Sequence, residues 1–260
     1  MRVLITNDDG WESPGIGVLA GVARDLGAAV VVAAPAWNSS GASASITGVS
    51  EHGRLVFEEH TRPDVADVTF VGVEAAPAMI VRAGVRGAFG PPPDLVLSGI
   101  NDGPNTGHAI LHSGTVGAAL TAATHGCRSV AFSLGVEQPP NYEASAEVAR
   151  RVIPWAVDAA APLTLNVNTP SCASEKLRGM RRAALADFGA VQTNITERGE
   201  GHVELRYSEV ETESNDSDAG LLAAGWATIT ALRPVCEASD YDLSALLDDL
   251  LAENGVGEIR

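Results

Sequence analysis

The sequence predicts an α/β fold in which a doubly wound, mostly parallel, Rossmann-like sheet is covered by helices on both faces. Two observations support this class. Short apolar runs alternate with amphipathic segments through residues 1–170, and one run has the continuous β-branched character of a strand covered on both sides. Residues 171–260 change to an alternating pattern, which predicts a C-terminal extension of hairpins and a terminal helix. No internal repeat or long linker divides the chain, so residues 1–260 are expected to form a single domain.

The first two strands and the helix between them form a βαβ unit. Val3–Thr6 is a short buried strand, Gly15–Leu26 places its apolar residues on one helical face, and Ala28–Ala34 is the continuous β-branched run. Gly27 ends the helix. The polar stretch at residues 35–48 follows, and its Ser, Gly and Ala content excludes it from the core.

Further strands and helices alternate along the rest of the core. The predicted strands are Val68–Val73, Asp94–Ser98, Arg128–Leu134 and Leu163–Val167. The predicted helices between them are Pro77–Phe89, Ser113–His125 and Tyr142–Ala160. In the extension we expect two paired antiparallel strands, Met180–Phe188 and Gly201–Val210, followed by an acidic loop at Glu209–Ser217. A further strand at Trp226–Leu232 and an amphipathic helix at Leu243–Leu251 complete the extension.

The charge balance excludes several classes of partner. The chain has 33 Asp and Glu against 17 Lys and Arg, and its net charge is −16. This charge repels nucleic acid backbones and anionic membrane surfaces, so neither is an expected partner. Lys176 is the only lysine. A P-loop NTPase, which needs a lysine after its glycine-rich loop, is therefore excluded.

Cysteine usage and hydropathy predict a cytoplasmic location. The three cysteines are widely spaced and include no Cys-x-x-Cys pair, so neither a disulfide framework nor a thiolate metal site is indicated. The chain begins with a strand pattern instead of a charged and then apolar leader, and no segment reaches about 18 apolar residues. We expect no membrane partner.

Four polar loops are expected at one edge of the sheet, three of them after predicted strands and the fourth at the start of a predicted helix. Because ligands of open parallel sheets bind beyond the carboxyl ends of the strands, these loops are expected to converge. Their sequences are Asn7-Asp8-Asp9-Gly10, residues 38–47 from Asn38-Ser39-Ser40-Gly41 to Ser45-Ile46-Thr47, residues 98–107 with Asn101 and Asn105, and His112-Ser113-Gly114-Thr115.

Two adjacent carboxylates, Asp8 and Asp9, indicate a divalent cation. Like charges repel, and burying even one is unfavourable by several kcal/mol unless a cation or strong donors compensate. Carboxylate, hydroxyl and amide oxygens suit Mg²⁺, Mn²⁺ or Ca²⁺. A helix that begins at Ser113-Gly114-Thr115 offers unpaired N–H groups to a phosphate. A metal site beside an anion site indicates phosphoryl chemistry.

Each loop also has an ordinary structural interpretation. Asp-Asp-Gly is most often a turn or a helix N-cap, the Asn-rich loop is a tight-turn sequence, and Ser113 is a natural N-cap. The three histidines His108, His112 and His125 are better explained as structural than as metal ligands. The combination of four such loops at one predicted edge is more specific than any single loop.

The chain resembles the SurE (survival protein E) nucleotidases, which are metal-dependent phosphatases of nucleoside 5′- and 3′-monophosphates. The resemblance spans essentially the whole chain and rests on the motifs "TNDDG", "AP" followed by "S…SIT", "PDLVLSGIN.G.N.G", "SGTVGAAL", "LNVN.P" and Gly225-Trp226-Ala227-Thr228-Ile229-Thr230. It implies one divalent cation per subunit, Mg²⁺ or Mn²⁺ with Ca²⁺ possible in a crystal, held by Asp8, Asp9, Ser40 and Asn101. It also implies a phosphorylated small-molecule substrate, whose binding site would be lined by Asn7, Gly41, Asn105, Ser113, Gly114 and Thr115.

Three departures from the family pattern concern the substrate. The family's Arg before the metal-binding Ser is Ser39 here, its Gly-His before "SIT" is Ser43-Ala44, and the Asp of its "GTPADC" motif is Met79. These changes leave the expected metal ligands intact. They favour, as an alternative, a phosphatase specialised for an unusual phosphorylated metabolite of a biosynthetic pathway.

Asp8 and Asp9 are the expected catalytic residues, as general base or as nucleophile. A haloacid-dehalogenase-type phosphatase is disfavoured, because it needs Asp-x-Asp and a later lysine. A non-catalytic nucleotide-binding protein with the same fold is the alternative outside the enzymes. The C-terminal third resembles the segments that SurE subunits exchange, so we expect a homodimer or a homotetramer.

Overall fold

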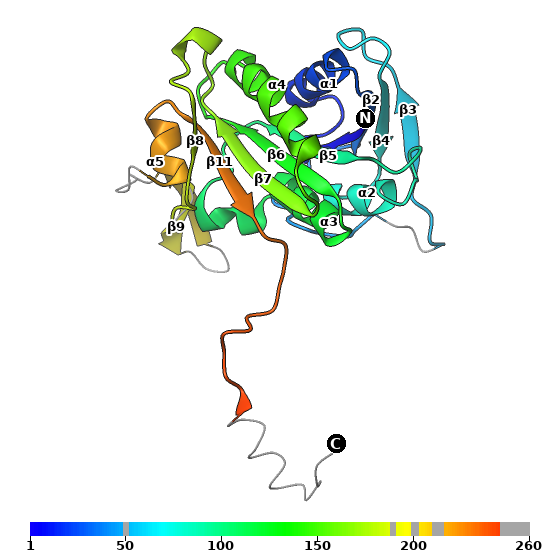
Figure 1. The fold of residues 1–260 in the computed structure, drawn as a ribbon. Helices are drawn as coiled ribbons and strands as arrows, with labels where there is room; N and C mark the ends of the chain where they lie inside the picture. The colour runs from blue at the N-terminus through cyan, green and yellow to red at the C-terminus, as the bar shows by residue number, and fades with distance from the viewer. Residues whose placement is uncertain (49–51, 188–190, 199–202, 210–215, 245–260) are drawn as a thin grey trace, which may run out of the picture.

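The computed structural model describes residues 1–48, 52–187, 191–198, 203–209 and 216–244. Its centre is a nine-stranded sheet in the order β3-β4-β2-β1-β5-β6-β7-β11-β8 (Figure 1). The strands of this sheet are β1 (Arg2–Thr6), β2 (Ala29–Pro35), β3 (Phe57–His60), β4 (Thr69–Val73), β5 (Leu95–Asn101), β6 (Arg128–Leu134), β7 (Leu163–Thr169), β8 (Met180–Arg182) and β11 (Ala227–Leu232). Strands β9 (Val191–Arg198) and β10 (Val203–Glu209) form a separate antiparallel pair.

Helices cover both faces of the sheet (Figure 1). The α-helices are α1 (Pro14–Asp25), α2 (Pro77–Gly84), α3 (Gly114–Thr124), α4 (Glu143–Asp158) and α5 (Asp218–Ala223), and the 3₁₀ helices are η1 (Gly107–His112) and η2 (Ser174–Lys176). Helix α1 packs against α4, and α2 packs against α3. The two pairs lie on opposite faces (Figure 1), as a doubly wound fold requires.

The chain reverses its direction across the sheet between β1 and β5. From β1 it moves outward through β2 to β4, and it then returns to pair β5 with β1 on the other side. Strands β6 and β7 continue outward in parallel from β5. This reversal is a topological switch point, where the loops after neighbouring strands separate and leave room for a ligand. The predicted doubly wound α/β class is confirmed.

Alternation along the central strands divides the apolar core into two layers. Val3 and Ile5 of β1 face the layer under α1 and α4, which also holds Ile16. Leu4 faces the other layer, together with Ile80 of α2. All five side chains are buried. Each face of β1 is therefore apolar, which explains the uninterrupted apolar run that follows Arg2 in the sequence.

Several predicted boundaries shift. Helix α2 ends at Gly84 instead of Phe89, because the backbone turns through Gly87, which has a φ of +92°. Strand β5 continues three residues beyond Ser98, and Asn101 pairs with Ser133 of β6. The sequence pattern missed the longer β5 because polar residues occupy the strand end.

The predicted strand pairing of the extension is wrong. Residues 180–182 form β8, which pairs in parallel with β11, while the partner of β10 is β9. Strand β8 is held beside β11 partly by Trp226, whose ring lies under the guanidinium groups of Arg178 and Arg181 at 4.9 and 5.2 Å. The pattern also missed β3 and α5. Most of the predicted terminal helix at Leu243–Leu251 lies outside the described residues, as does most of the acidic loop at 209–217.

None of the helices in the described ranges has both the length and the apolar character of a membrane span.

The approach of α1 to β5 yields a prediction. A Cβ atom on Gly15 would lie 2.0 Å from the carbonyl oxygen of Ile100, whereas a Cβ on Gly21 of the same helix would meet no atom within 4 Å. We expect Gly15→Ala to lower the free energy of unfolding by about 2 kcal/mol or more. Gly21→Ala, the matched control, is expected to raise it by roughly 0.5 to 1 kcal/mol through helix propensity. Urea denaturation of both variants measures the difference, and equal midpoints would contradict this packing.

Candidate functional site

The loop after β1 is shaped by Asn7. Its side-chain Nδ2 donates to the carbonyl oxygen of Gly10 at 2.9 Å and to Oγ of Ser13 at 2.8 Å, and its Oδ1 accepts from the Gly10 N–H at 3.1 Å. Asn7 is fully buried. Its amide atoms are thus engaged within the loop, and they fix the backbone that carries Asp8 and Asp9.

Asp8 lies against the first turn of α3. It is 3% exposed, and Oδ1 accepts a hydrogen bond from the hydroxyl of Thr115. Burial raises the pKa of Asp8, while hydrogen bonds from that hydroxyl and from the backbone N–H groups of Gly114 and Thr115 act in the opposite direction. A Cβ on Gly114 would lie 2.7 Å from Cβ of Asp8, so only glycine permits this approach. The anion that this helix end holds in the structure is therefore Asp8 itself.

Thr115 joins two of the predicted metal ligands. Its hydroxyl lies within hydrogen-bond distance of Oδ1 of Asp8 and, at 3.2 Å, of Oδ1 of Asn101. Asn101 ends β5, and its Nδ2 donates to the carbonyl oxygen of Gly103 at 2.7 Å. The amide is thereby oriented with its oxygen toward the Thr115 hydroxyl. The structure brings Asp8 and Asn101 together across the switch point, as the sequence predicts.

Asp9 is less buried than Asp8 and lies beside the next loop. Its Oδ2 accepts from the backbone N–H of Asp102 at 3.2 Å. Burial and, next, the charge of Asp8 raise the pKa of Asp9 to about 6. Along the described chain, none of the ion pairs formed by arginine involves Asp8 or Asp9. The pair is therefore a site of uncompensated negative charge.

The loop after β2 reaches the site through Ser39. The Ser39 N–H donates to the carbonyl oxygen of Asp8 at 2.6 Å. Ser40, the predicted ligand, follows and is exposed, and its N–H donates to Oδ1 of Asn38 at 2.9 Å. Gly41 is exposed in a turn with a φ of +81°. The structure thus places Ser40 one residue from the backbone tether to Asp8, on the solvent side.

Asn105 is clamped by the ends of β6 and β7. Its Nδ2 donates to Oγ of Ser133 at 2.8 Å, and its backbone N–H donates to Oδ1 of Asn168 at 2.8 Å. Its carbonyl oxygen accepts from Nδ2 of Asn166 and of Asn168 at 2.8 and 2.9 Å. The two asparagines of the "LNVN" strand therefore hold the third loop of the site.

The C-terminal extension holds the same loop through Asp218. This carboxylate is fully buried, and it accepts from the N–H groups of Gly107, Ala186 and Ala219 at 2.9, 2.9 and 2.8 Å. Burial raises its pKa and these three donors oppose the rise. Asp218 links η1, which begins at Gly107, to α5. Sequence reasoning missed Asp218, because an acid at the start of a short helix is ordinary capping chemistry.

Ser113 is the N-cap of α3. Its buried Oγ accepts from the N–H of Val116 at 3.1 Å, and its hydroxyl hydrogen remains available for a further acceptor. Of the predicted phosphate-binding residues, Ser113 and Asn105 lie on the loops that flank Asp8, while Gly114 and Thr115 contact Asp8 directly.

Tyr142 is a further residue near the site that the sequence did not single out. It is half-buried before α4, and burial, followed by the carboxylates of Asp102 and Asp9, raises its pKa. An aromatic at a helix start carries no distinctive sequence signal.

A metal site made only of His, Cys, Asp or Glu is absent from the described residues, since no three of these side chains cluster suitably. The arrangement around Asp8 differs in kind, because it combines two carboxylates with the amide oxygen of Asn101. Such a set of hard oxygen donors suits Mg²⁺ or Mn²⁺. The site can therefore hold a divalent cation.

Comparisons with known proteins agree with this geometry. The family model described as survival protein SurE matches residues 3–191. The 5′-nucleotidase SurE of Pseudomonas putida is 34% identical over 239 residues, which cover 90% of this chain and 92% of that protein. The 5′-nucleotidase SurE of Azotobacter vinelandii is 34% identical over 260 residues, with 96% and 100% covered.

The fold is also that of a solved structure. The crystal structure of the Sure protein from Aquifex aeolicus superimposes with a TM-score of 0.76 at 28% sequence identity, and the match covers 96% of this chain and 99% of that chain. On the family model, these relatives and the shared architecture, the chain belongs to the SurE family.

Proposed function

We infer that this chain is a phosphomonoester hydrolase of the nucleotidase type, and we propose that it acts on nucleoside 5′- or 3′-monophosphates with one divalent cation, Mg²⁺ or Mn²⁺. One observation carries the proposal. Asp8, Asp9 and Asn101 meet at the switch point of the sheet, in a chain whose family relatives are 5′-nucleotidases.

The residues at this point fit a divalent cation. Asp8 and Asp9 are close enough for the charge of one to raise the pKa of the other, and the described side chains supply no cation to offset them. Asp8, Asp9 and Asn101 would hold the ion, and Ser40 would complete the set from the solvent side. When bound, the cation supplies Lewis-acid activation of the phosphoryl group and of the attacking water.

The chain's own groups would orient the phosphate and move a proton. The hydroxyl of Ser113 donates to a phosphoryl oxygen, while the Asn105 loop and the exposed turn at Ser40 and Gly41 limit the phosphate on either side. Asp9 is the more exposed of the two carboxylates. Its Oδ2 accepts from the Asp102 N–H, and its Oδ1 would accept the proton of the attacking water.

The phosphate side differs from the family pattern at Ser39. A serine there leaves this loop without the family's cationic side chain, and Met79 is half-buried in α2. A substrate panel distinguishes the two candidates: nucleoside monophosphates serve the proposed activity, and sugar phosphates and other phosphorylated metabolites serve the specialised alternative. A non-catalytic binding protein would release no phosphate from any compound at any Mn²⁺ or Mg²⁺ concentration.

Replacing Asp8 tests the site directly. We expect Asp8→Asn to lower kcat for p-nitrophenyl phosphate and for nucleoside monophosphates by at least about 100-fold, because the site loses one of the two negative charges that would bind the cation. The fold should persist, since the amide fills the same buried volume without a charge. Asp67→Asn is the control, as Asp67 is an exposed carboxylate of the β3–β4 loop. Full turnover by the Asp8 variant would refute the assignment.

Substitution of Thr115 tests whether its hydroxyl supports cation binding or phosphate binding. Thr115→Val removes the hydroxyl that contacts Asp8 and Asn101. We expect the Mn²⁺ dissociation constant to rise by about 10-fold, with KM at saturating Mn²⁺ changed by less than about 2-fold. Thr115→Ser should retain both values. A large rise in KM at unchanged Mn²⁺ affinity would instead place this hydroxyl on the phosphate, as the sequence predicts.

We further propose that the chain is a homodimer or homotetramer. After β11 the described chain leaves the body as an extended arm, residues 233–244 (Figure 1), and Val235, Tyr241 and Leu243 on it are exposed. A second apolar surface lies beside Trp155 and Met180, at a cavity between α4 and the end of the sheet. Large apolar side chains exposed in this number mark association surfaces. Light scattering after gel filtration should give at least twice the 26.8 kDa chain mass, and a monomer would refute the proposal.

A further inference from the structure

Arg62 contacts the loop after β1 from outside the candidate site. It lies in the segment between β3 and β4, at the edge of the sheet and three strands away from β1. We propose that Arg62 is a positioning residue for the candidate cation site, because its guanidinium fixes the backbone that follows Asp8 and Asp9. This inference rests on the proposed function, since it concerns the cation that those carboxylates would bind.

The guanidinium makes two sets of contacts. Nη1 donates to the carbonyl oxygens of Trp11 and Ser13 at 3.1 and 2.8 Å. Nε and Nη2 donate to the two carboxylate oxygens of Asp64 at 3.1 and 2.7 Å. The bidentate pair with Asp64 sets the plane of the guanidinium, and the remaining N–H groups then point at the loop.

The packing around Arg62 has little freedom. Its side chain is only 13% exposed, and its Cζ lies 5.2 Å from the centre of the Phe70 ring. A Cβ on Gly17 would lie 2.6 Å from Nη2, so the first turns of α1 leave space for the guanidinium only because this residue is glycine. Arg62 is therefore closely packed between the β3–β4 segment and the start of α1.

A stacked aromatic pair joins the same two segments. The ring of Trp11 lies parallel to that of His60, with 3.9 Å between centroids and 3° between planes. Gly72 of β4 makes room for both rings, because a Cβ there would lie 2.9 Å from Trp11 and 3.1 Å from His60. The residue two positions after Asp9 is thus fixed by a side-chain stack and by a carbonyl contact with Arg62.

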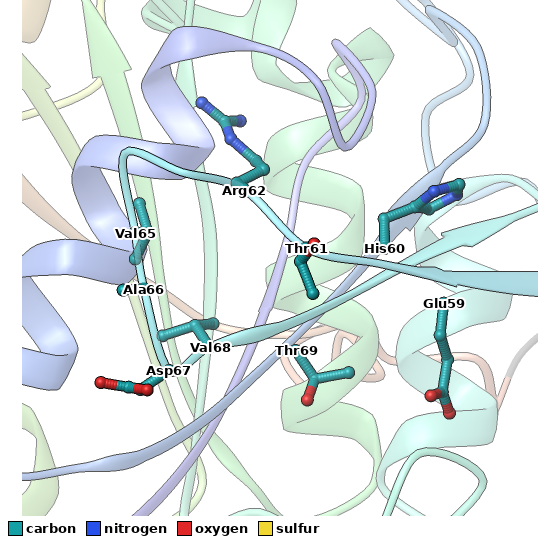
Figure 2. Close-up of a pocket in the computed structure, with 9 residues that line it drawn as sticks. All are labelled: Glu59, His60, Thr61, Arg62, Val65, Ala66, Asp67, Val68 and Thr69. Carbon is teal, nitrogen blue, oxygen red and sulfur yellow. The ribbon is translucent and has the colours of Figure 1, made fainter.

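Arg62 and His60 form part of the wall of a cavity of about 600 Å³ at the connection from β3 to β4. Figure 2 shows the Arg62 side chain leaving this wall toward α1, while His60 points to the opposite side. None of the predicted site residues lines the cavity. The connection from this edge to the site therefore runs through Arg62 and His60.

The inside of the loop has its own support, which makes the role of Arg62 separable from folding. Asn7 ties Gly10 and Ser13 together, and the N–H of Trp11 donates to the carbonyl oxygen of Pro35 at 3.1 Å. Loss of Arg62 should leave these bonds in place and widen the range of positions open to the loop. Since a cation needs both carboxylates in register, its affinity should fall before the fold is lost.

The test compares Arg62→Gln with Arg24→Gln. Arg24 is the matched control, because it also pairs with an aspartate and donates to the same segment, at the Ala66 carbonyl, but makes no contact with the loop. Calorimetric titration of the metal-free proteins with Mn²⁺ should show a dissociation constant raised by about 10-fold or more in Arg62→Gln and by less than about 2-fold in Arg24→Gln. Amide exchange at residues 10–13 should be faster in Arg62→Gln alone, and KM at saturating Mn²⁺ should change by less than about 2-fold.

Two further variants test the same role of Arg62. Arg62→Lys retains the positive charge but not the planar guanidinium with its several N–H donors. Its Mn²⁺ affinity should therefore lie between that of Arg62→Gln and that of the wild-type protein. If Arg62→Gln does not fold, Asp64→Asn replaces it, because Asp64 is exposed and its loss weakens the orientation of the guanidinium; a smaller loss of affinity is then expected. Unchanged Mn²⁺ affinity and loop exchange in the folded variants would overturn the inference. A wild-type protein that binds Mn²⁺ but hydrolyses no phosphate ester would contradict the proposed activity alone, since the binding comparison remains decisive.

Discussion

The buried carboxylate of Asp8 at the N-terminus of α3 determines the arrangement of the whole site. A charge at this depth needs strong donors, and the hydroxyl of Thr115 and the first N–H groups of α3 supply them. That contact requires glycine at position 114 and fixes α3 against the end of β1. Because α3 follows β5 in the chain, the same contact places Asn101 beside Asp8. One electrostatic requirement therefore positions three of the elements at the switch point.

The remaining loops are held by side chains and not by the sheet. Asn7 closes the first loop on itself, Asn166 and Asn168 hold the third, and Asp218 brings the C-terminal extension to it. Each of these side chains is short and buried, so it loses little conformational freedom when it forms its bonds. Each also satisfies backbone groups that a loop cannot pair by itself. The site is thus organised before any ligand arrives, which is the condition for effective binding of a transition state.

The sequence predicted the parts of this structure that depend on local pattern. The apolar runs located the six central strands, and the rule that ligands bind at the carboxyl ends of such strands was sufficient to bring Asp8, Asp9 and Asn101 together. It did not predict β3, β9 or α5, and it paired β8 with the wrong strand. The elements β3, β8 and α5 are short, exposed or capped like ordinary turns, and their positions depend on partners far along the chain. Thr115 shows the same limit. Its type and helix position suited a phosphate, but the burial of Asp8 beside it, which only tertiary structure reveals, directs its hydroxyl to the carboxylate.

The charge of the chain bears on how a phosphate would reach this site. A net charge of −16 repels a doubly charged phosphate ester, and Ser39 places a neutral side chain on the loop nearest to Asp8. The donors at the start of α3 are already directed at Asp8, so they offer less of their field to a second anion. Without a cation, the pair Asp8 and Asp9 would add further repulsion, since even the raised pKa of Asp9, about 6, leaves it largely ionised at neutral pH. The proposed cation is therefore required for the substrate to bind as well as for its hydrolysis, and it takes over the attraction that an arginine beside Ser40 would otherwise share.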